Sequence, residues 1–286
     1  MATSPTGRGA EGGSEGPEPG AGAQVTTRRF ALVVEYDGRA FCGWERQPHC
    51  ESVQAAVERA LSRVADEPIR VVCAGRTDSG VHALGQVVHF DTRARRLEDA
   101  WRRGANANLA AGVAVVAAHE VPGDFHARFS ARWRHYRYLL LNRPDRPAVL
   151  HGRVAWDRRP LDLARIRAAV GPLVGTHDFS AYRASACQAP SPVRTVHALD
   201  VQRRDAQFCF DVVADGFLHR MVRNIVGVLL AIGAGEAEPE WAREVLESRD
   251  RTQGGVTAPA EGLYLVRVGY SARYSLPAVL PDSGVW

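Results

Sequence analysis

Residues 69–90 read IRVVCAGRTDSGVHALGQVVHF, two apolar runs joined by a loop that contains two glycines. The runs at 69–74 and 86–90 are short and rich in valine, which is typical of buried β-strands. The segments on either side complete the order βαββαβ, which is that of the split ferredoxin-like unit. They are a strand at 30–36, a helix at 53–64 with Ser52 as its N-cap, a helix at 97–107 and a strand at 113–121.

The second half of the chain repeats this pattern. A hairpin connection is expected at 203–206. Gly233 and Gly235 should end the helix predicted at 217–232. The predicted elements are strands at 133–141, 193–202, 207–214 and 263–270, and helices at 161–174, 217–232 and 238–248.

Two related halves predict an α+β fold with two ferredoxin-like (βαββαβ-type) halves whose sheets meet at a central cleft. An N-terminal α+β domain should span 28–124, and a C-terminal α+β domain should span 125–272. Residues 1–27 hold seven glycines and no aromatic or branched aliphatic side chain before Val25. Such a segment buries too little surface to offset its chain entropy, so we expect a disordered tail there and a C-terminal extension over 273–286.

All 36 basic residues are arginines, and the formal net charge is +4. Residues 1–24 carry three glutamates and one arginine, so the remainder of the chain carries +6. Arginine offers a planar fork suited to phosphate and a flat face that stacks on a base. A basic body of this kind is compatible with a nucleic-acid partner, although many basic proteins bind none.

The five cysteines are widely spaced and contain no Cys-x-x-Cys pair. This spacing argues against a disulfide framework or a zinc site and fits a reducing cytosol. The N-terminus lacks the apolar stretch of a signal peptide, and the longest apolar run, 225–232, is too short to span a bilayer. We therefore expect a soluble, cytoplasmic protein with no membrane contact.

The loop between the first two apolar runs holds Asp78 between Gly75 and Gly80. The glycines permit positive φ and close approach of a ligand, and a rigid strand end is a common place for a catalytic carboxylate. A plain turn is the alternative, because Asp-Ser-Gly is also a common turn sequence. The loop is not a phosphate-binding Walker loop, since Gly-Lys-Ser/Thr is missing.

Arginines and aromatic residues interleave most densely over 124–138. In a strand at 133–138, Arg134, Tyr136 and Tyr138 share one face, which could stack a base and neutralise phosphate. The alternative is a solvated strand whose aromatic side chains belong to the core.

The third informative segment, 217–227, places Arg220, Arg223, Asn224 and Gly227 on one helical face. Two charges on an otherwise apolar helix need a partner, because an unpaired buried charge is costly. The alternative is a half-exposed helix with solvated arginines.

Taken together and in this order, these segments resemble the TruA-type tRNA pseudouridine synthases over residues 28–270. So many short motifs in register favour a catalytic Asp78 over the turn. The motifs are Glu35-Tyr36-Asp37-Gly38, Gly43-Trp44, Ser52-Val53-Gln54, Ala74-Gly75-Arg76-Thr77-Asp78, Gly80-Val81-His82, Asn106-Ala107-Asn108-Leu109, Phe125-His126-Ala127-Arg128, Tyr136-Arg137-Tyr138, Arg143-Pro144, His177-Asp178-Phe179, Met221-Val222-Arg223-Asn224-Ile225-Val226-Gly227 and Ala260-Glu261-Gly262-Leu263-Tyr264.

The resemblance implies an isomerase that converts uridine to pseudouridine at positions 38, 39 and 40 in the anticodon stem-loop of tRNAs. By motif, Asp78 is the catalytic aspartate of the cleft, and Arg223 is the arginine that pairs with it. Tyr136 matches the tyrosine that packs on the target uracil and is a candidate base. Arg76 matches an arginine near the entrance that could fill the gap left by the extruded base.

The resemblance also implies a homodimer in which one tRNA spans both subunits. No cofactor is expected, because the isomerisation involves no net redox change and no second substrate. No metal is expected either, since the sequence has no metal-ligand spacing, and His82 and His89 are interpreted as structural.

Three other functions compete with this hypothesis. The first is a non-catalytic RNA-binding or RNA-chaperone protein built from two ferredoxin-like halves. The second keeps the chemistry but acts on another RNA or position. The third is a small-molecule enzyme that uses the loop at 75–80 as a phosphate cradle.

Overall fold

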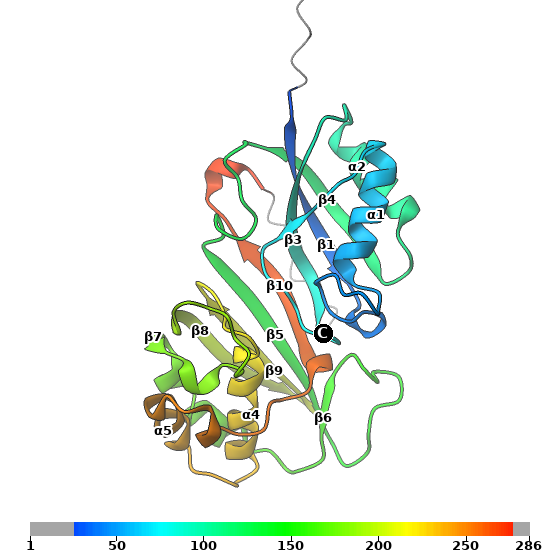
Figure 1. The fold of residues 1–286 in the computed structure, drawn as a ribbon. Coiled ribbons are helices and arrows are strands. Elements are labelled where there is room, and N and C mark those ends of the chain that lie inside the picture. The colour runs from blue at the N-terminus through cyan, green and yellow to red at the C-terminus, as the bar shows by residue number, and fades with distance from the viewer. Residues whose placement is uncertain (1–25, 277–286) are drawn as a thin grey trace, which may run out of the picture.

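The computed structural model describes residues 26–276, and its strands form one ten-stranded mixed sheet (Figure 1). Eight strands follow the order β4-β1-β3-β10-β5-β9-β8-β7, while β2 pairs with β3 and β6 pairs with β5. Residues 1–25 of the predicted disordered tail and residues 277–286 of the predicted extension lie outside the described residues. No helix within 26–276 is long and apolar enough to cross a membrane.

The N-terminal part of the sheet has the predicted ferredoxin-like order, β4-β1-β3 with β2 on β3. Ser52 caps α1 as expected, because its hydroxyl accepts a hydrogen bond from the N–H of Ala55. Phe30, Phe90 and Trp101 pack together in the core below the helices. The elements are β1 (Arg28–Tyr36), α1 (Val53–Ala65), β2 (Val72–Cys73), β3 (His82–Thr92), α2 (Glu98–Asn108) and β4 (Val113–Val121).

The C-terminal part repeats the ferredoxin-like order as β10-β5-β9-β8, with β7 added at the edge. The predicted connection at 203–206 is a tight hairpin between β8 and β9. The elements are β5 (Trp133–Asn142), β6 (Ala155–Asp157), α3 (Leu163–Ala168), β7 (Gly175–Asp178), β8 (Val193–Arg204), β9 (Gln207–Ala214), α4 (Met221–Gly233), α5 (Trp241–Ser248) and β10 (Leu263–Gly269).

The two ferredoxin-like sheets do not face each other as separate sheets but join edge to edge. The parallel pairing of β10 with β3 is short and aligns Tyr264 with His82 and Leu265 with Ala83. The rings of His82 and Tyr264 stack across this seam, with centroids 4.6 Å apart. Since β3 begins at His82, directly after the loop that holds Asp78, the seam fixes that loop near the middle of the sheet (Figure 1).

The strand predicted at 69–74 is mostly wrong, because β2 spans only Val72 and Cys73, and the N–H of Ala74 makes one further hydrogen bond to β3 at the Val87 carbonyl. The backbone N–H of Val71 donates to the buried carboxylate of Glu58, and that of Ile69 donates to the hydroxyl of Ser62. These donors are satisfied by side chains of α1, so no ladder forms there.

The predicted helix at 161–174 is also too long. The carboxylate of Asp162 caps α3, but the helix ends at Ala168, and a 3-10 turn over Gly171–Leu173 follows. Glycine and proline at 171 and 172 disfavour continuation of an α-helix, since glycine is entropically costly and proline lacks an N–H.

The cysteine spacing argued against a disulfide framework, but the structure contains one disulfide. Cys42 and Cys50 form a disulfide, with Cα atoms 6.2 Å apart, whereas Cys73, Cys187 and Cys209 are unpaired. The segment follows η1 (Gly38–Ala40), and the N–H of Cys42 donates to the carbonyl of Glu51, which brings the two positions together. A search for Cys-x-x-Cys spacing does not detect a contact of this kind.

Candidate active site

Asp78 lies in a turn between β2 and β3 that neighbouring backbone holds in place. Its carbonyl accepts from the N–H of Val81, and Gly80 adopts a φ of +79°. Gly43, at φ +92°, packs so closely that a Cβ there would lie 2.8 Å from the Thr77 carbonyl oxygen. Gly80 therefore needs the positive φ expected of it, whereas Gly75 does not adopt one.

The carboxylate of Asp78 meets two side chains from the far half of the chain. Nη1 of Arg223 donates to its Oδ2 at 2.9 Å, and Nε2 of His219 donates to its Oδ1 at 3.1 Å. Nε of Arg220 is 3.8 Å from Oδ2. The Asp78 side chain keeps 27% of its surface exposed, so it remains open to a substrate while two donors fix its rotamer.

Arg223 is itself anchored. Its Nε donates to the carbonyl of Ala258 at 2.8 Å, and its side chain is only 13% exposed. Arg223 therefore has the partner expected for it, the carboxylate of Asp78. The alternative of a solvated arginine does not hold at this position.

Tyr136 projects from β5 with only 7% of its surface exposed, and its ring packs edge-on against Phe217, with centroids 5.0 Å apart. Burial raises the pKa of Tyr136; the positive charge of Arg134 acts in the opposite direction, and the negative charge of Asp78 adds to the rise. The phenol is therefore neutral near pH 7.

Arg76 lies at the surface, two residues before Asp78. Its side chain is 63% exposed and forms an ion pair with Glu45 at 2.6 Å. No contact joins Arg76 to the Asp78 carboxylate within the described chain. An exposed pair of this kind is weak and easily exchanged for a ligand phosphate or base.

The expected common face of Arg134, Tyr136 and Tyr138 does not form a ligand platform. The guanidinium of Arg134 donates to the carbonyls of Ala74, Arg128 and Asp215, and Tyr138 is fully buried with its hydroxyl on the carbonyl of Pro259. Of the three side chains, only Tyr136 remains a candidate for the site.

The predicted helical face at 220–227 is also partly wrong. Arg220 has a φ of +61° and precedes the helix, which starts at Met221. Asn224 is buried and donates to the Tyr182 carbonyl, while Gly227 lies against the backbone of Val256. Only Arg223 of this set contacts Asp78 from within α4.

Sequence reasoning missed His219 and Phe217 as members of the site. Both stand directly before α4 in a segment that the sequence singled out for its arginines. A histidine and a phenylalanine beside two arginines could have indicated a site. We expected residues 217–220 to be helical, however, and that expectation points the two side chains in the wrong direction.

The histidines near the sheet centre have structural partners. Nδ1 of His82 accepts from the N–H of Gly38, and Nδ1 of His89 accepts from the N–H of Ala127. Burial, with the positive charge of Arg29, lowers the pKa of His89 to about 4, which keeps it neutral. Within residues 26–276, no three His, Cys, Asp or Glu side chains are grouped to hold a metal ion.

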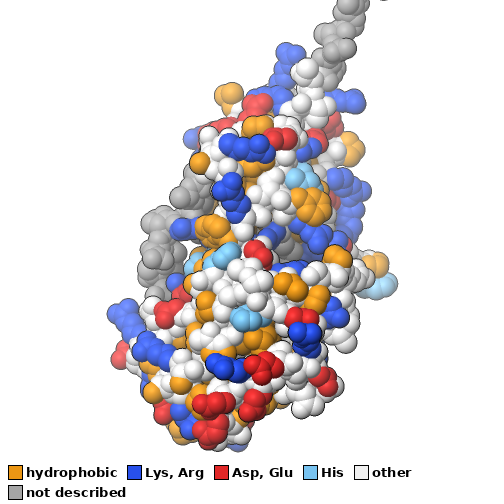
Figure 2. Space-filling view, turned by 90° about the vertical axis from the view of Figure 1, so that its left-hand side faces the viewer, with side chains coloured by type: hydrophobic (Ala, Val, Ile, Leu, Met, Phe, Trp, Pro, Cys, Tyr) orange, Lys and Arg blue, Asp and Glu red, His pale blue; other side chains and the backbone are white. Residues whose placement is uncertain are grey.

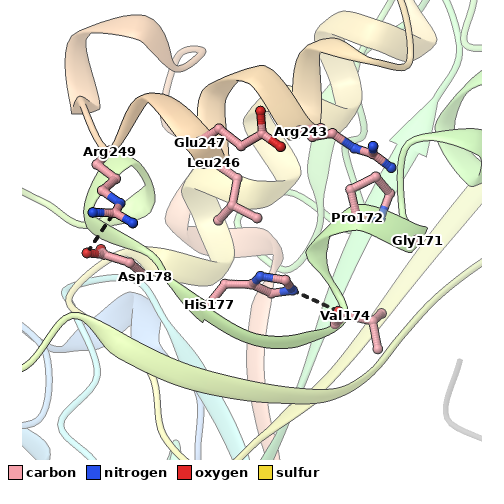
Figure 3. Close-up of a pocket in the computed structure, with 9 residues that line it drawn as sticks. All are labelled: Gly171, Pro172, Val174, His177, Asp178, Arg243, Leu246, Glu247 and Arg249. Carbon is pink, nitrogen blue, oxygen red and sulfur yellow. Dashed lines mark hydrogen bonds and ion pairs between the residues drawn. The ribbon is translucent and has the colours of Figure 1, made fainter.

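A cavity of about 470 Å³ lies elsewhere, between α5, β7 and the 3-10 turn before β7 (Figure 3). Arg249 pairs with Asp178 there at 3.8 Å, and Nε2 of His177 is hydrogen-bonded to the Val174 carbonyl. These polar groups satisfy one another, and none of the residues that contact Asp78 lines the cavity. The candidate active site is therefore the Asp78 cluster.

Arginine side chains are spread over both the upper and the lower part of the face in Figure 2. This distribution agrees with the basic charge of the chain outside its first residues. Acidic side chains gather mainly at the lower end of the same face, so the positive charge available to an extended anionic ligand lies chiefly above that end.

Comparisons with known proteins agree on one family. The sequence model of the family described as tRNA pseudouridine synthase matches residues 32–130 and 169–271. A tRNA pseudouridine synthase A of Nitrosococcus oceani is 55% identical over 258 residues, which covers 90% of this chain and 100% of that relative. One of Pseudomonas aeruginosa is 53% identical over 262 residues, which covers 91% of this chain and 92% of that relative.

Proposed function

The chain belongs to the tRNA pseudouridine synthase family, and we propose that it isomerises uridine to pseudouridine at positions 38, 39 and 40 in the anticodon stem-loop of tRNAs, with Asp78 as the catalytic residue. The observation that carries the proposal is the partly exposed Asp78 carboxylate, held by Arg223 and His219. As a member of this family, the chain is an isomerase.

The reaction asks for an ionised carboxylate. The C1′–N1 bond of uridine breaks, the uracil turns over, C1′ bonds to C5, N1 gains a proton and C5 loses one. A carboxylate serves either as a nucleophile at C1′ or C6 or as a stabiliser of positive charge on the sugar. The two donors on Asp78 preset its direction before the substrate arrives, which lowers the reorganisation needed during reaction.

Tyr136 is proposed to pack on the target uracil. Its buried ring supplies an apolar surface, and its raised pKa keeps the phenol protonated in the free enzyme. Accepting the C5 proton would therefore require that the phenol first lose its own proton during turnover. Packing is the role that the resting state supports.

Arg76 is proposed to contact the RNA at the mouth of the site. Among residues 26–276, the exposed guanidinium is paired with exposed Glu45 and can exchange this partner for a group of the RNA. Stacking into the gap left by a flipped uridine would offset part of the few kcal/mol that extrusion costs.

The proposal divides the chain into an N-terminal domain, 28–124, which carries Asp78, and a C-terminal domain, 125–272, which supplies Tyr136, His219 and Arg223. We also propose that the protein forms a homodimer and is located in the cytoplasm. The tRNA is the expected partner, and binding should weaken steeply with salt as arginines displace condensed counterions.

The experiment is incubation of the purified protein with unmodified tRNA transcripts that carry uridine at one of the three positions, followed by mapping of pseudouridine. Product at these positions without added cofactor supports the proposal. Product only outside the anticodon arm would refute the substrate assignment. Tight tRNA binding with no product at any position would favour the RNA-binding alternative.

A further inference from the structure

One exposed aromatic side chain stands apart from the active site. Phe129 lies in the segment between β4 and β5 and exposes 77% of its surface, although it is a large apolar residue. A single exposed apolar side chain is ordinary at a protein surface, but a ring whose orientation is fixed offers a preorganised face for stacking.

The orientation of Phe129 is fixed by His126. The two rings stack with centroids 4.4 Å apart and an interplanar angle of 29°. Nδ1 of His126 accepts from the backbone N–H groups of Arg128 and Phe129, at 3.2 and 3.1 Å. The outward ring is therefore part of an ordered turn.

His126 is itself held in place by His89 and Ser130. Its ring packs on that of His89, with centroids 4.7 Å apart, and its backbone is bound to Ser130 in both directions. Burial, with the positive charge of Arg29, lowers the pKa of His126, which favours the neutral ring whose Nδ1 accepts these bonds.

This turn adjoins the catalytic loop. Nη2 of Arg134 donates to the carbonyl of Arg128 at 2.9 Å and to the carbonyl of Ala74 at 3.0 Å, so one nitrogen joins both segments. Ala74 directly precedes the loop that holds Arg76 and Asp78.

Positive charge accompanies the ring itself. The guanidinium carbon of Arg128 lies 5.6 Å from the centre of the Phe129 ring. An aromatic face beside a guanidinium matches an unpaired nucleotide, whose base stacks and whose phosphate is anionic. A protein partner would instead match a broader apolar patch.

We propose that Phe129 and Arg128 form a second RNA contact, in which the ring stacks on an unpaired base of the substrate while the guanidinium meets its phosphate. The inference rests on the proposed function for the identity of the RNA. Unpaired bases of a stem-loop can be splayed out to stack on such a ring, whereas paired bases are not available. The contact would hold the loop while the target uridine enters the Asp78 site.

The test compares Phe129→Ala, Phe129→Trp and Leu97→Ala, measuring Kd for an unmodified tRNA transcript and kcat and KM for pseudouridine formation. Leu97 is the matched control because it exposes 79% of its surface and lies before α2. Phe129→Ala should raise Kd and KM at least fivefold with kcat within twofold, since loss of one stacked base weakens binding on that scale. Phe129→Trp should bind within twofold of the parent, and Leu97→Ala should be unchanged.

Equal Kd values for Phe129→Ala and the parent would overturn the inference. So would a change in molar mass by light scattering for Phe129→Ala, because the ring would then serve a protein contact. If the parent binds tRNA but forms no pseudouridine, the proposed function fails, while the Kd comparison still decides the role of Phe129. Arg128→Gln should lower the slope of log Kd against log salt by about one unit relative to the parent, and an unchanged slope would contradict the phosphate contact.

Discussion

Nη1 of Arg223 lies 2.9 Å from Oδ2 of Asp78, although the two residues are 145 positions apart in the chain. The bond joins α4 to the loop before β3, across the seam where β10 pairs with β3. The Asp78 cluster is thus completed only when the two ferredoxin-like parts share one sheet.

Replacing Arg223 should impair catalysis more than binding. Arg223→Ala removes the donor to Oδ2 and leaves the Ala258 carbonyl without its Nε partner. We expect kcat to fall about 100-fold or more, which is typical of losing a preorganised charged group, while Kd for tRNA changes less than threefold. Single-turnover assays with parallel filter binding would measure both, and an equal loss in Kd would contradict a role on Asp78.

His219 should act as a positioning residue, since its contact is with Asp78. His219→Gln can keep an N–H donor near Oδ1, whereas His219→Ala cannot. We expect kcat to fall roughly tenfold in the alanine variant and to recover substantially in the glutamine variant, in line with a hydrogen bond to a charged group. Equal kcat values for the two variants, at unchanged melting temperature, would indicate that the hydrogen bond is not used.

Gly43 should tolerate no side chain. A Cβ there would lie 2.8 Å from the Thr77 carbonyl oxygen, and its φ of +92° is unfavourable for other residues. Gly43→Ala should lower the free energy of unfolding by about 1–3 kcal/mol and reduce kcat by displacing the Asp78 loop. Urea unfolding checks the first effect.

Gly123→Ala is the control, because nothing lies within 4 Å of a Cβ at that position and its φ is not positive. It should leave stability and activity unchanged. A similar loss in both variants would mean that the close packing at Gly43 is unimportant.

The Cys42–Cys50 disulfide should stabilise the segment that supports the catalytic loop. It closes the turn that contains Trp44, whose N–H donates to the Thr77 carbonyl. Replacing both cysteines with serine should cost about 2 kcal/mol of unfolding free energy, as expected for closing a short loop. Urea unfolding with and without reductant measures it, and identical curves would show that the bond contributes no stability.

Sequence patterns predicted the α+β order well because strand and helix periodicities are local. Both β4 and β9 begin and end where the apolar alternation does, and Ser52 caps α1 as its residue type suggests. The strand before the Asp78 loop was overpredicted, because the side chains of Glu58 and Ser62 capture its N–H groups. Competition of that kind depends on tertiary structure and leaves no periodic signal.

The site was predictable only in part. Asp78, Arg223 and Tyr136 came from motif resemblance, and the structure places the guanidinium of Arg223 on the carboxylate of Asp78, while the role of Tyr136 stays a prediction. His219 was missed because Arg220 adopts φ +61° and shifts the start of α4, a conformation that sequence rarely signals outside glycine. The pairing of β10 with β3, which joins the two halves, likewise has no local pattern.

The most direct test of the central claim is nucleoside analysis of anticodon-arm tRNA transcripts after incubation with the parent protein and with Asp78→Asn. The substitution keeps the shape of the side chain but removes its charge. The account predicts pseudouridine with the parent, none with Asp78→Asn, and Kd values for tRNA within a few-fold of each other. Pseudouridine formed by Asp78→Asn at a rate near that of the parent would contradict the assignment of Asp78 as the catalytic residue.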